Sequence, residues 1–260
     1  MAAPSLRMIA VLLAIGTLAL PLAVPTEVRG EAPAVDPAAT KLLQRMTDYL
    51  GSLDRFSLHT GNTIEDVLET GQKIQYDFVT SVVVQRPDKL RAERTGDLID
   101  QVVVYDGKTL TIFDAGKNYY AVADAPDNID DVLHFARDTL DLVPPSGDLI
   151  YTNSFELLTA PVTSGMVVGK SIIDGVRCDH LAFSGPVVDW QIWIADGDKP
   201  LPYKYVITTK DDPAQPEYIL MMSNWSVEPK LKDALFKFKA PKDATKIDFL
   251  RMDDGHTSMH

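Results

Sequence analysis

Short segments with a two-residue period follow one another between residues 56 and 123, and tight-turn dipeptides separate them. Apolar and polar side chains alternate in these segments, which is typical of half-buried strands. Asp106-Gly107 is the strongest of the turn signals between them. The strands expected here are residues 56–64, 73–85, 89–94, 98–105, 109–114 and 118–123. Because only tight turns join them, the pattern predicts an antiparallel meander and not a sheet of alternating strands and helices.

The strand pattern resumes in the second half of the chain, after a helical interruption. One helix is expected to begin at Asp36-Pro37, with Asp36 as its N-cap, and others over residues 129–140 and near 155–158. The later strands are expected at residues 165–173, 176–184, 188–195, 204–210, 217–228 and 236–240. Helices that interrupt a run of strands are expected to cover one face of the sheet. The predicted fold class is therefore mainly β, within the α+β class.

The first thirty residues have the pattern of a secretory signal peptide. Arg7 supplies the positive charge, residues 8–20 are apolar, and Val28-Arg29-Gly30 places small residues at a cleavage site. A retained membrane anchor is the alternative, but the longer apolar stretch of residues 8–24 lies at the lower edge of what spans a bilayer, and Pro21 breaks it. No cysteine near this segment offers a site for lipid attachment, so we expect a periplasmic mature protein without a stable transmembrane anchor.

These features divide the chain into four expected parts. They are a signal peptide at residues 1–30, a flexible mature N-terminus at 31–37, one domain at 38–250 and a disordered tail at 251–260.

The charge of the chain restricts its partners. The formal net charge is -12, with 37 acidic and 25 basic residues, and such a surface repels nucleic acid and anionic lipid headgroups. We therefore expect no nucleic-acid partner, and we expect any lipid to be bound in an apolar cavity and not at a basic membrane-docking face. The single cysteine excludes a disulfide within the chain.

Candidate catalytic residues are few. The chain has no Gly-x-Ser-x-Gly, no His-Glu-x-x-His and no glycine-rich phosphate loop. Cys178 and His180 lie two residues apart, so on a strand they would share a face and could form an activated thiolate or two ligands of a metal. A buried cysteine beside a hydrogen-bonded histidine explains the same pair. We favour this second interpretation, and predict no catalytic residue, metal site or cofactor.

The strand expected at residues 188–195 is apolar on both faces. Trp190 would lie on one face and Trp193 on the other, so both faces need cover. Two interpretations remain open: the tryptophans pack in an ordinary core, or one of them lines a ligand cavity. Both are therefore candidate ligand-contact residues.

Three stretches, in this order, resemble the lipoprotein-carrier proteins of the LolA/LolB-like superfamily. They are Val82 to Arg91 with its Arg86-Pro87 step, Asp106 to Leu110, and Asp233 to Pro241. This resemblance implies a curved, half-open antiparallel barrel with helices covering its concave face. It also implies that Arg86, at the position of the carriers' Arg-Pro arginine, fastens the helical lid through hydrogen bonds to helix carbonyl groups. The alternative for Arg86 is a solvent-facing turn residue. The lid region, residues 124–163, differs from that of the carriers.

A second resemblance is closer. The runs Arg86 to Arg91, Cys178 to Phe183 and Asp189 to Ile194 are similar to those of a family of predicted periplasmic proteins of unknown function. That family has no assigned activity, so the resemblance predicts a periplasmic location but no reaction or ligand.

Together these observations predict a periplasmic, non-catalytic protein that binds or carries a lipid, an acyl chain or a lipidated protein in a hydrophobic groove. A concave sheet must bury its inner face against helices or against a ligand. The alternatives are an envelope regulatory module that binds a partner protein, which could be an envelope membrane protein, and an enzyme that uses Cys178 and His180.

Overall fold

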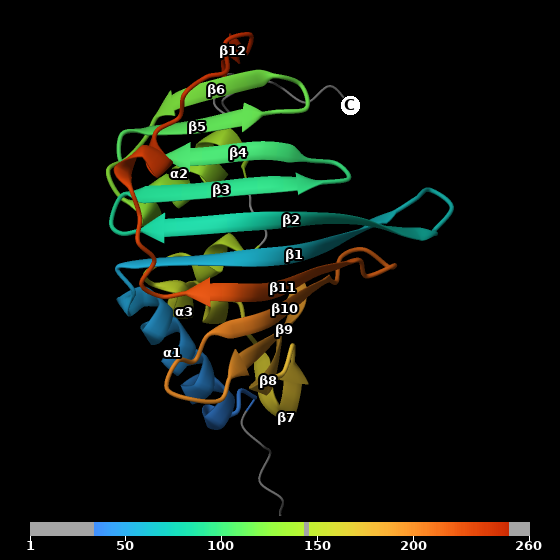
Figure 1. The fold of residues 1–260 in the computed structure, drawn as a ribbon. Helices are drawn as coiled ribbons and strands as arrows, with labels where there is room; N and C mark the ends of the chain where they lie inside the picture. Colours follow the sequence, from blue (N-terminus) through green and yellow to red (C-terminus); the bar gives the residue numbers. More distant parts are fainter. Residues whose placement is uncertain (1–33, 143–145, 250–260) are drawn as a thin grey trace, which may run out of the picture. The chain divides into compact units, whose positions relative to one another are not determined.

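The computed structural model describes residues 34–142 and 146–249. The expected signal peptide and tail lie outside the described residues. In the described part, twelve strands form one sheet in the order β12-β6-β5-β4-β3-β2-β1-β11-β10-β9-β8-β7. Neighbouring strands are antiparallel, except for the parallel pair β12 and β6 (Figure 1). The mainly β fold class is confirmed.

Two meanders make up this sheet. The first comprises β1 (Arg55–Val67), β2 (Lys73–Gln85), β3 (Lys89–Gly96), β4 (Asp100–Tyr105), β5 (Thr109–Asp114) and β6 (Tyr119–Asp124). The second comprises β7 (Ser164–Ile173), β8 (Val176–Ser184), β9 (Val188–Ala195), β10 (Pro202–Thr209) and β11 (Glu217–Ser226), and β12 (Thr245–Ile247) follows it. Pairing of β1 with β11 joins the meanders, so residues far apart in sequence meet at the centre of the sheet.

The helices pack on one face of the sheet. They are α1 (Pro37–Ser52), α2 (Ile129–Leu140) and α3 (Ser154–Thr159), with a 3-10 turn η1 (Gly147–Leu149) between the last two. Side-chain caps begin the two longer helices: Asp36 accepts from the Ala38 amide, and Asn128 accepts from the Asp131 amide. Their apolar stripes, including Leu43 of α1 and Val132 of α2, share one core with the sheet's inner-facing side chains.

The chain after β11 crosses the opposite, outer face of the sheet (Figure 1). Phe238 packs against Phe113 of β5 and Tyr120 of β6, with ring centroids 5.8 and 5.4 Å apart. The carbonyl oxygen of Leu235 accepts a hydrogen bond from Arg91 of β3. This segment was expected to form a strand at residues 236–240. That prediction is wrong: a 3-10 turn, η2 (Asp233–Phe236), precedes irregular chain, because the segment lies across the strands and cannot join their ladder.

The N-terminal side of α1 is attached to the edge of the sheet. The Asp36 amide donates to the carbonyl oxygen of Gly165, and the Gly165 amide donates to the carbonyl oxygen of Ala34. Residues 34–36 therefore pair with β7, and Pro37 already belongs to α1. This differs from the flexible N-terminus expected at residues 31–37, of which residues 31–33 lie outside the described part.

Candidate ligand pocket

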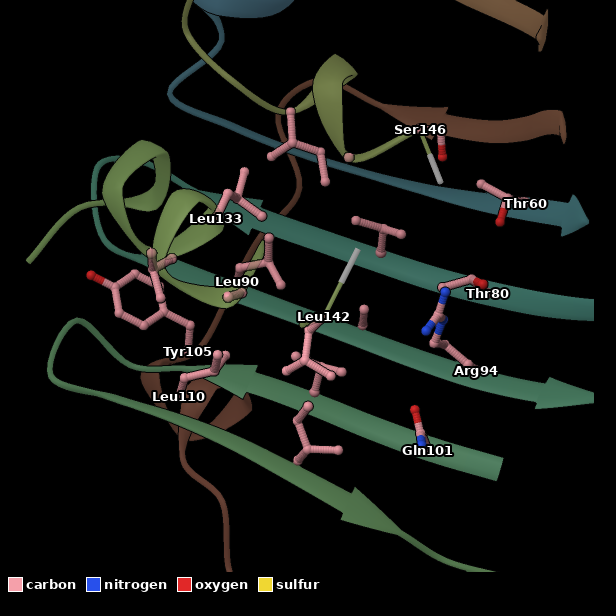
Figure 2. A pocket seen from close by; sticks show the side chains of 18 of the residues that line it. Thr60, Thr80, Leu90, Arg94, Gln101, Tyr105, Leu110, Leu133, Leu142 and Ser146 are labelled. Atoms are coloured by element: carbon pink, nitrogen blue, oxygen red, sulfur yellow. The ribbon is translucent and has the colours of Figure 1, made fainter. Parts of the chain in front are cut away.

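A cavity of about 360 Å³ lies between α2 and the inner face of strands β1 to β5. Figure 2 shows apolar side chains at one end and polar ones at the other. The aliphatic part of its lining includes Val82, Leu90, Val103, Leu110, Ile112, Leu133 and Leu142. The polar part includes Thr60, Asn62, Thr80, Arg94, Gln101 and Tyr218. The cavity is therefore amphipathic along its length.

Strand register produces the polar end. Thr60 of β1 pairs with Thr80 of β2, Thr80 pairs with Arg94 of β3, and Arg94 pairs with Gln101 of β4. Residues paired across adjacent strands project from the same face, so these four side chains form one row across the sheet. This row of Thr60, Thr80, Arg94 and Gln101 is called the polar row below.

Two apolar rows follow it at two-residue steps along the strands. The nearer row contains Leu58, Val82, Ala92, Val103 and Ile112. The farther row contains Phe56, Val84, Leu90, Tyr105 and Leu110. Each two-residue step covers about 6.8 Å, so the apolar path from the polar row to the row of Leu90 is roughly 13 Å long.

Asn62 organises the hydroxyl groups beside the polar row. Its side-chain amide donates to the Thr60 and Thr80 hydroxyl oxygens, at 2.8 and 3.3 Å, and its carbonyl oxygen accepts from the Tyr218 hydroxyl. Asn62 is buried, with 4% of its surface exposed, so it depends on these partners. Thr60 and Thr80 act as acceptors in this network. Among the described residues, neither threonine hydroxyl has a hydrogen-bond acceptor for its own proton.

Arg94 is the cationic group of the pocket. It is half-buried, and its guanidinium lies over the Phe78 ring at 5.4 Å from the centroid. Burial lowers the pKa of Arg94, although an arginine remains protonated at neutral pH. Within residues 34–142 and 146–249, Arg94 forms no ion pair and no side-chain hydrogen bond, and the pocket carboxylate Asp141 is not paired with it.

Arg86 lies at the end of β2, beside the segment that follows η1. Its Nη2 donates to the carbonyl oxygen of Ile150 at 2.7 Å, and Ile150 lines the pocket. Burial lowers the pKa of Arg86, and the nearby Asp130 of α2 opposes that effect. Arg86 is half-buried and not directed into solvent, and its Nε is buried without a partner among the described residues. The side chain thus joins the sheet to the region expected to form the lid.

The two tryptophans lie apart from the pocket. Trp190 is in the main core, stacked on Phe183 with ring centroids 4.2 Å apart. Trp193 is on the outer face, stacked on His180 with ring centroids 4.0 Å apart, and the Lys204 ammonium lies 4.7 Å from the centroid of its ring. Neither is among the residues that line the cavity. The cavity-lining interpretation of the tryptophans thus has no support from this geometry, and ordinary packing accounts for both.

Sequence reasoning missed Arg94, Gln101 and Asn62. The signal that could have found them is polar residues at inward positions of otherwise alternating strands, as in Ala92-x-Arg94 and Gln101-x-Val103. Their convergence depends on strand register, which the sequence does not show.

Cys178 and His180 lie on the same face of the sheet, as the spacing predicts. Their surroundings do not favour an activated thiolate. Burial, reinforced by the charge of Asp179, raises the pKa of the Cys178 thiol to about 11, which disfavours the thiolate. His180 is hydrogen-bonded to Gln191 at 2.9 Å, and burial lowers its pKa. Across the described residues, no cluster of three or more His, Cys, Asp or Glu side chains could hold a metal ion.

Taken together, the fold and the cavity define a β-sheet protein with an amphipathic pocket under a helix. The sequence matches a family model described as "Predicted periplasmic protein (DUF2092)" over residues 39–250. The chain belongs to this family, which confirms the closer of the two resemblances seen in the sequence.

Among curated proteins, no sequence matches this chain. In residues 34–142 and 146–249, no helix combines the length and apolar character needed to cross a membrane.

Several solved structures are similar to this one. An uncharacterized conserved protein from Thermus thermophilus has 12% identity over 81% of this chain and 99% of its own, with a TM-score of 0.48. LprF from Mycobacterium bovis has 16% identity over 81% and 99%, with a TM-score of 0.44. The LolA superfamily protein NE2245 from Nitrosomonas europaea has 13% identity over 77% and 97%, with a TM-score of 0.34.

Proposed function

We propose that this protein binds a lipid or another acyl-bearing molecule in the periplasm, without catalysing a reaction. The observation that carries this proposal is the cavity of about 360 Å³ under α2, whose walls are mostly aliphatic. Ligand pockets have volumes of roughly 300–1,000 Å³, apolar walls and a few convergent polar groups. The size of this cavity suits one acyl chain better than a ligand with several.

The protein's charge supports burial of the ligand and not adsorption to a membrane surface. A net charge of -12 opposes contact with anionic headgroups, so an acyl chain would have to be taken into the cavity. Cleavage of residues 1–30 and export to the periplasm belong to the same proposal, as does the absence of a catalytic role for Cys178. The raised pKa of that thiol supports the non-catalytic assignment.

Native mass spectrometry of the mature protein, purified from the periplasm and extracted with organic solvent, tests this proposal. A stoichiometric acyl-bearing adduct is expected. Ala92→Phe should abolish it by filling the cavity, because Ala92 lines the pocket. Val79→Phe is the matched control, because Val79 lies on the outer face of β2 and is 61% exposed. A mass without adduct, unchanged after addition of fatty acid or phospholipid, would contradict the proposal.

Docking of a partner protein is a second candidate function, and strand β7 favours it. This strand lies at one end of the sheet, and its side chains Met166, Val168 and Ile172 are more than half exposed. An exposed apolar edge strand is a template for strand addition by another chain. The same native mass spectrum would show a retained partner mass, and Ile172→Asp should remove it.

A further inference from the structure

We propose that the ligand is an anionic amphiphile with a single acyl chain, and that its acidic head group binds Arg94 in the polar row. This inference rests on the proposed function, because it assigns the chemistry of the ligand that the cavity would hold. The head group would be a carboxylate or a phosphate, since the same donors recognise both. The acyl chain would lie along the two apolar rows toward Leu90.

The first step of the inference is the charge of Arg94. Two other arginines in the described residues have acidic partners: Arg91 pairs with Glu93 at 2.7 Å, and Arg137 pairs with Asp138 at 2.8 Å. Arg94 has no such partner in the described residues, although the chain carries 37 acidic side chains. A half-buried cation without a counter-ion is unfavourable, and an anion bound beside it would restore the lost electrostatic stabilisation. A guanidinium also offers a planar pair of donors that matches carboxylate and phosphate oxygens.

The second step is the direction of the neighbouring hydrogen bonds. The Asn62 amide donates to the hydroxyl oxygens of Thr60 and Thr80, which leaves both hydroxyl protons available to donate. Thr80 is paired directly with Arg94, so its hydroxyl is the nearer one to the guanidinium. The Gln101 side-chain amide, which pairs with Arg94 from the other side, can add a further donor. The polar row therefore offers donors from four adjacent strands, as an acceptor-only anion requires.

The third step is the arrangement of the polar and apolar parts. The polar row lies at one end of the cavity, with Leu90, Leu110 and Leu133 at the other (Figure 2). The intervening apolar path of roughly 13 Å follows from four residues of strand rise. A ligand with one charged end and one hydrocarbon chain matches this polarity. A cationic or zwitterionic choline head group would place positive charge against Arg94.

Calorimetric titration of the full mature chain with four probes of equal chain length tests the inference. The probes are dodecanoate, dodecyl phosphate, dodecanol and dodecyltrimethylammonium. We expect the two anions to bind the wild type about 10- to 100-fold more tightly than dodecanol, as charge-assisted hydrogen bonds would give. Comparison of the two anions identifies the head-group chemistry. The ammonium probe should bind more weakly than dodecanol.

Arg94→Gln should remove the preference for the two anions over dodecanol. Arg91→Gln is the matched control, because Arg91 is on the same strand but bonds to Leu235 on the outer face. If Arg94→Gln fails to fold, Thr80→Val tests the same row, with an expected several-fold loss for the anions alone. If neither dodecanoate nor dodecyl phosphate binds the wild type more tightly than dodecanol, this inference is overturned and the proposed function stands. Failure of all four probes to bind would overturn both.

Discussion

Arg86 donates a hydrogen bond from Nη2 to the carbonyl oxygen of Ile150 at 2.7 Å, so the end of β2 holds the segment that closes one side of the pocket. Asp130 of α2 accepts bonds from the amide and the hydroxyl of Thr152, two residues further along. The amide of Ile129 donates to the carbonyl oxygen of Pro87 at 2.8 Å. These contacts connect the Arg86-Pro87 turn, α2 and the segment after η1.

Arg86→Met should loosen this connection. It leaves the Ile150 carbonyl oxygen without its partner, and we expect a loss of about 1–3 kcal/mol in the free energy of unfolding. Urea denaturation measures that loss, and hydrogen exchange should quicken at the amides of residues 149–152. Arg55→Met is the control, because Arg55 is exposed at the start of β1. Equal stability of the two variants would show that the Arg86 bond contributes nothing measurable.

The tryptophans should affect stability and not ligand binding. Trp190 is 3% exposed within the main core, so Trp190→Ala should lower the free energy of unfolding by about 3–5 kcal/mol. Chemical denaturation measures this loss. Trp190→Phe keeps an aromatic ring against Phe183 and should lose less. For a folded Trp193→Ala, on the outer face, acyl-ligand affinity should equal that of the wild type. A large loss of affinity in that variant would restore Trp193 as a ligand contact.

Cys178 should resist alkylation in the folded protein. It is fully buried, and burial raises its pKa to about 11, so very little thiolate exists at pH 8. Incubation with iodoacetamide at pH 8, followed by mass measurement, should find the folded chain unmodified. The same reaction in 6 M guanidinium chloride is the control and should be complete. Rapid modification of the folded chain would contradict this prediction and support an enzyme that uses Cys178 and His180.

Stability should fall at alkaline pH because of Tyr105. Its hydroxyl donates to the carbonyl oxygen of Pro126, and burial, with smaller effects from Asp88 and other carboxylates, raises its pKa to about 12. A raised tyrosine pKa means that the neutral form is favoured in the folded state. This stabilisation is complete below the unfolded pKa of about 10 and is lost as the pH rises through about 12.

Unfolding free energies measured from pH 8 to pH 12 should show this loss in the wild type. Tyr105→Phe should be less stable near pH 8 and should show a shallower alkaline decline. Burial also raises the pKa of Tyr205. Tyr205 should therefore account for the decline in unfolding free energy that remains in Tyr105→Phe. Tyr119→Phe is the matched control on the exposed start of β6 and should follow the wild type. Parallel curves for wild type and Tyr105→Phe would contradict the assignment.

Local sequence patterns were enough to predict the strands, the start of the first helix and the alternation of inward and outward side chains along each strand. Period-two segments between turn dipeptides require strands whose successive side chains face opposite sides, and Asp36 with Pro37 marks a helix start, because both signals arise within a few residues. Short-range information also placed Cys178 and His180 on one face. The resemblance to the predicted periplasmic family depended on such local runs, and the family match over residues 39–250 agrees with it.

The polar residues that meet in the pocket are brought together by strand pairing, which no local sequence pattern predicts. Thr60, Thr80, Arg94 and Gln101 come together because three strand pairs adopt one register, and a shift of one residue would turn each side chain to the other face. The same holds for the path of residues 236–240, which local propensity makes a strand but which the outer face of the sheet accepts only as irregular chain. Register and helix docking depend on contacts between residues distant in sequence, so no local pattern contains them.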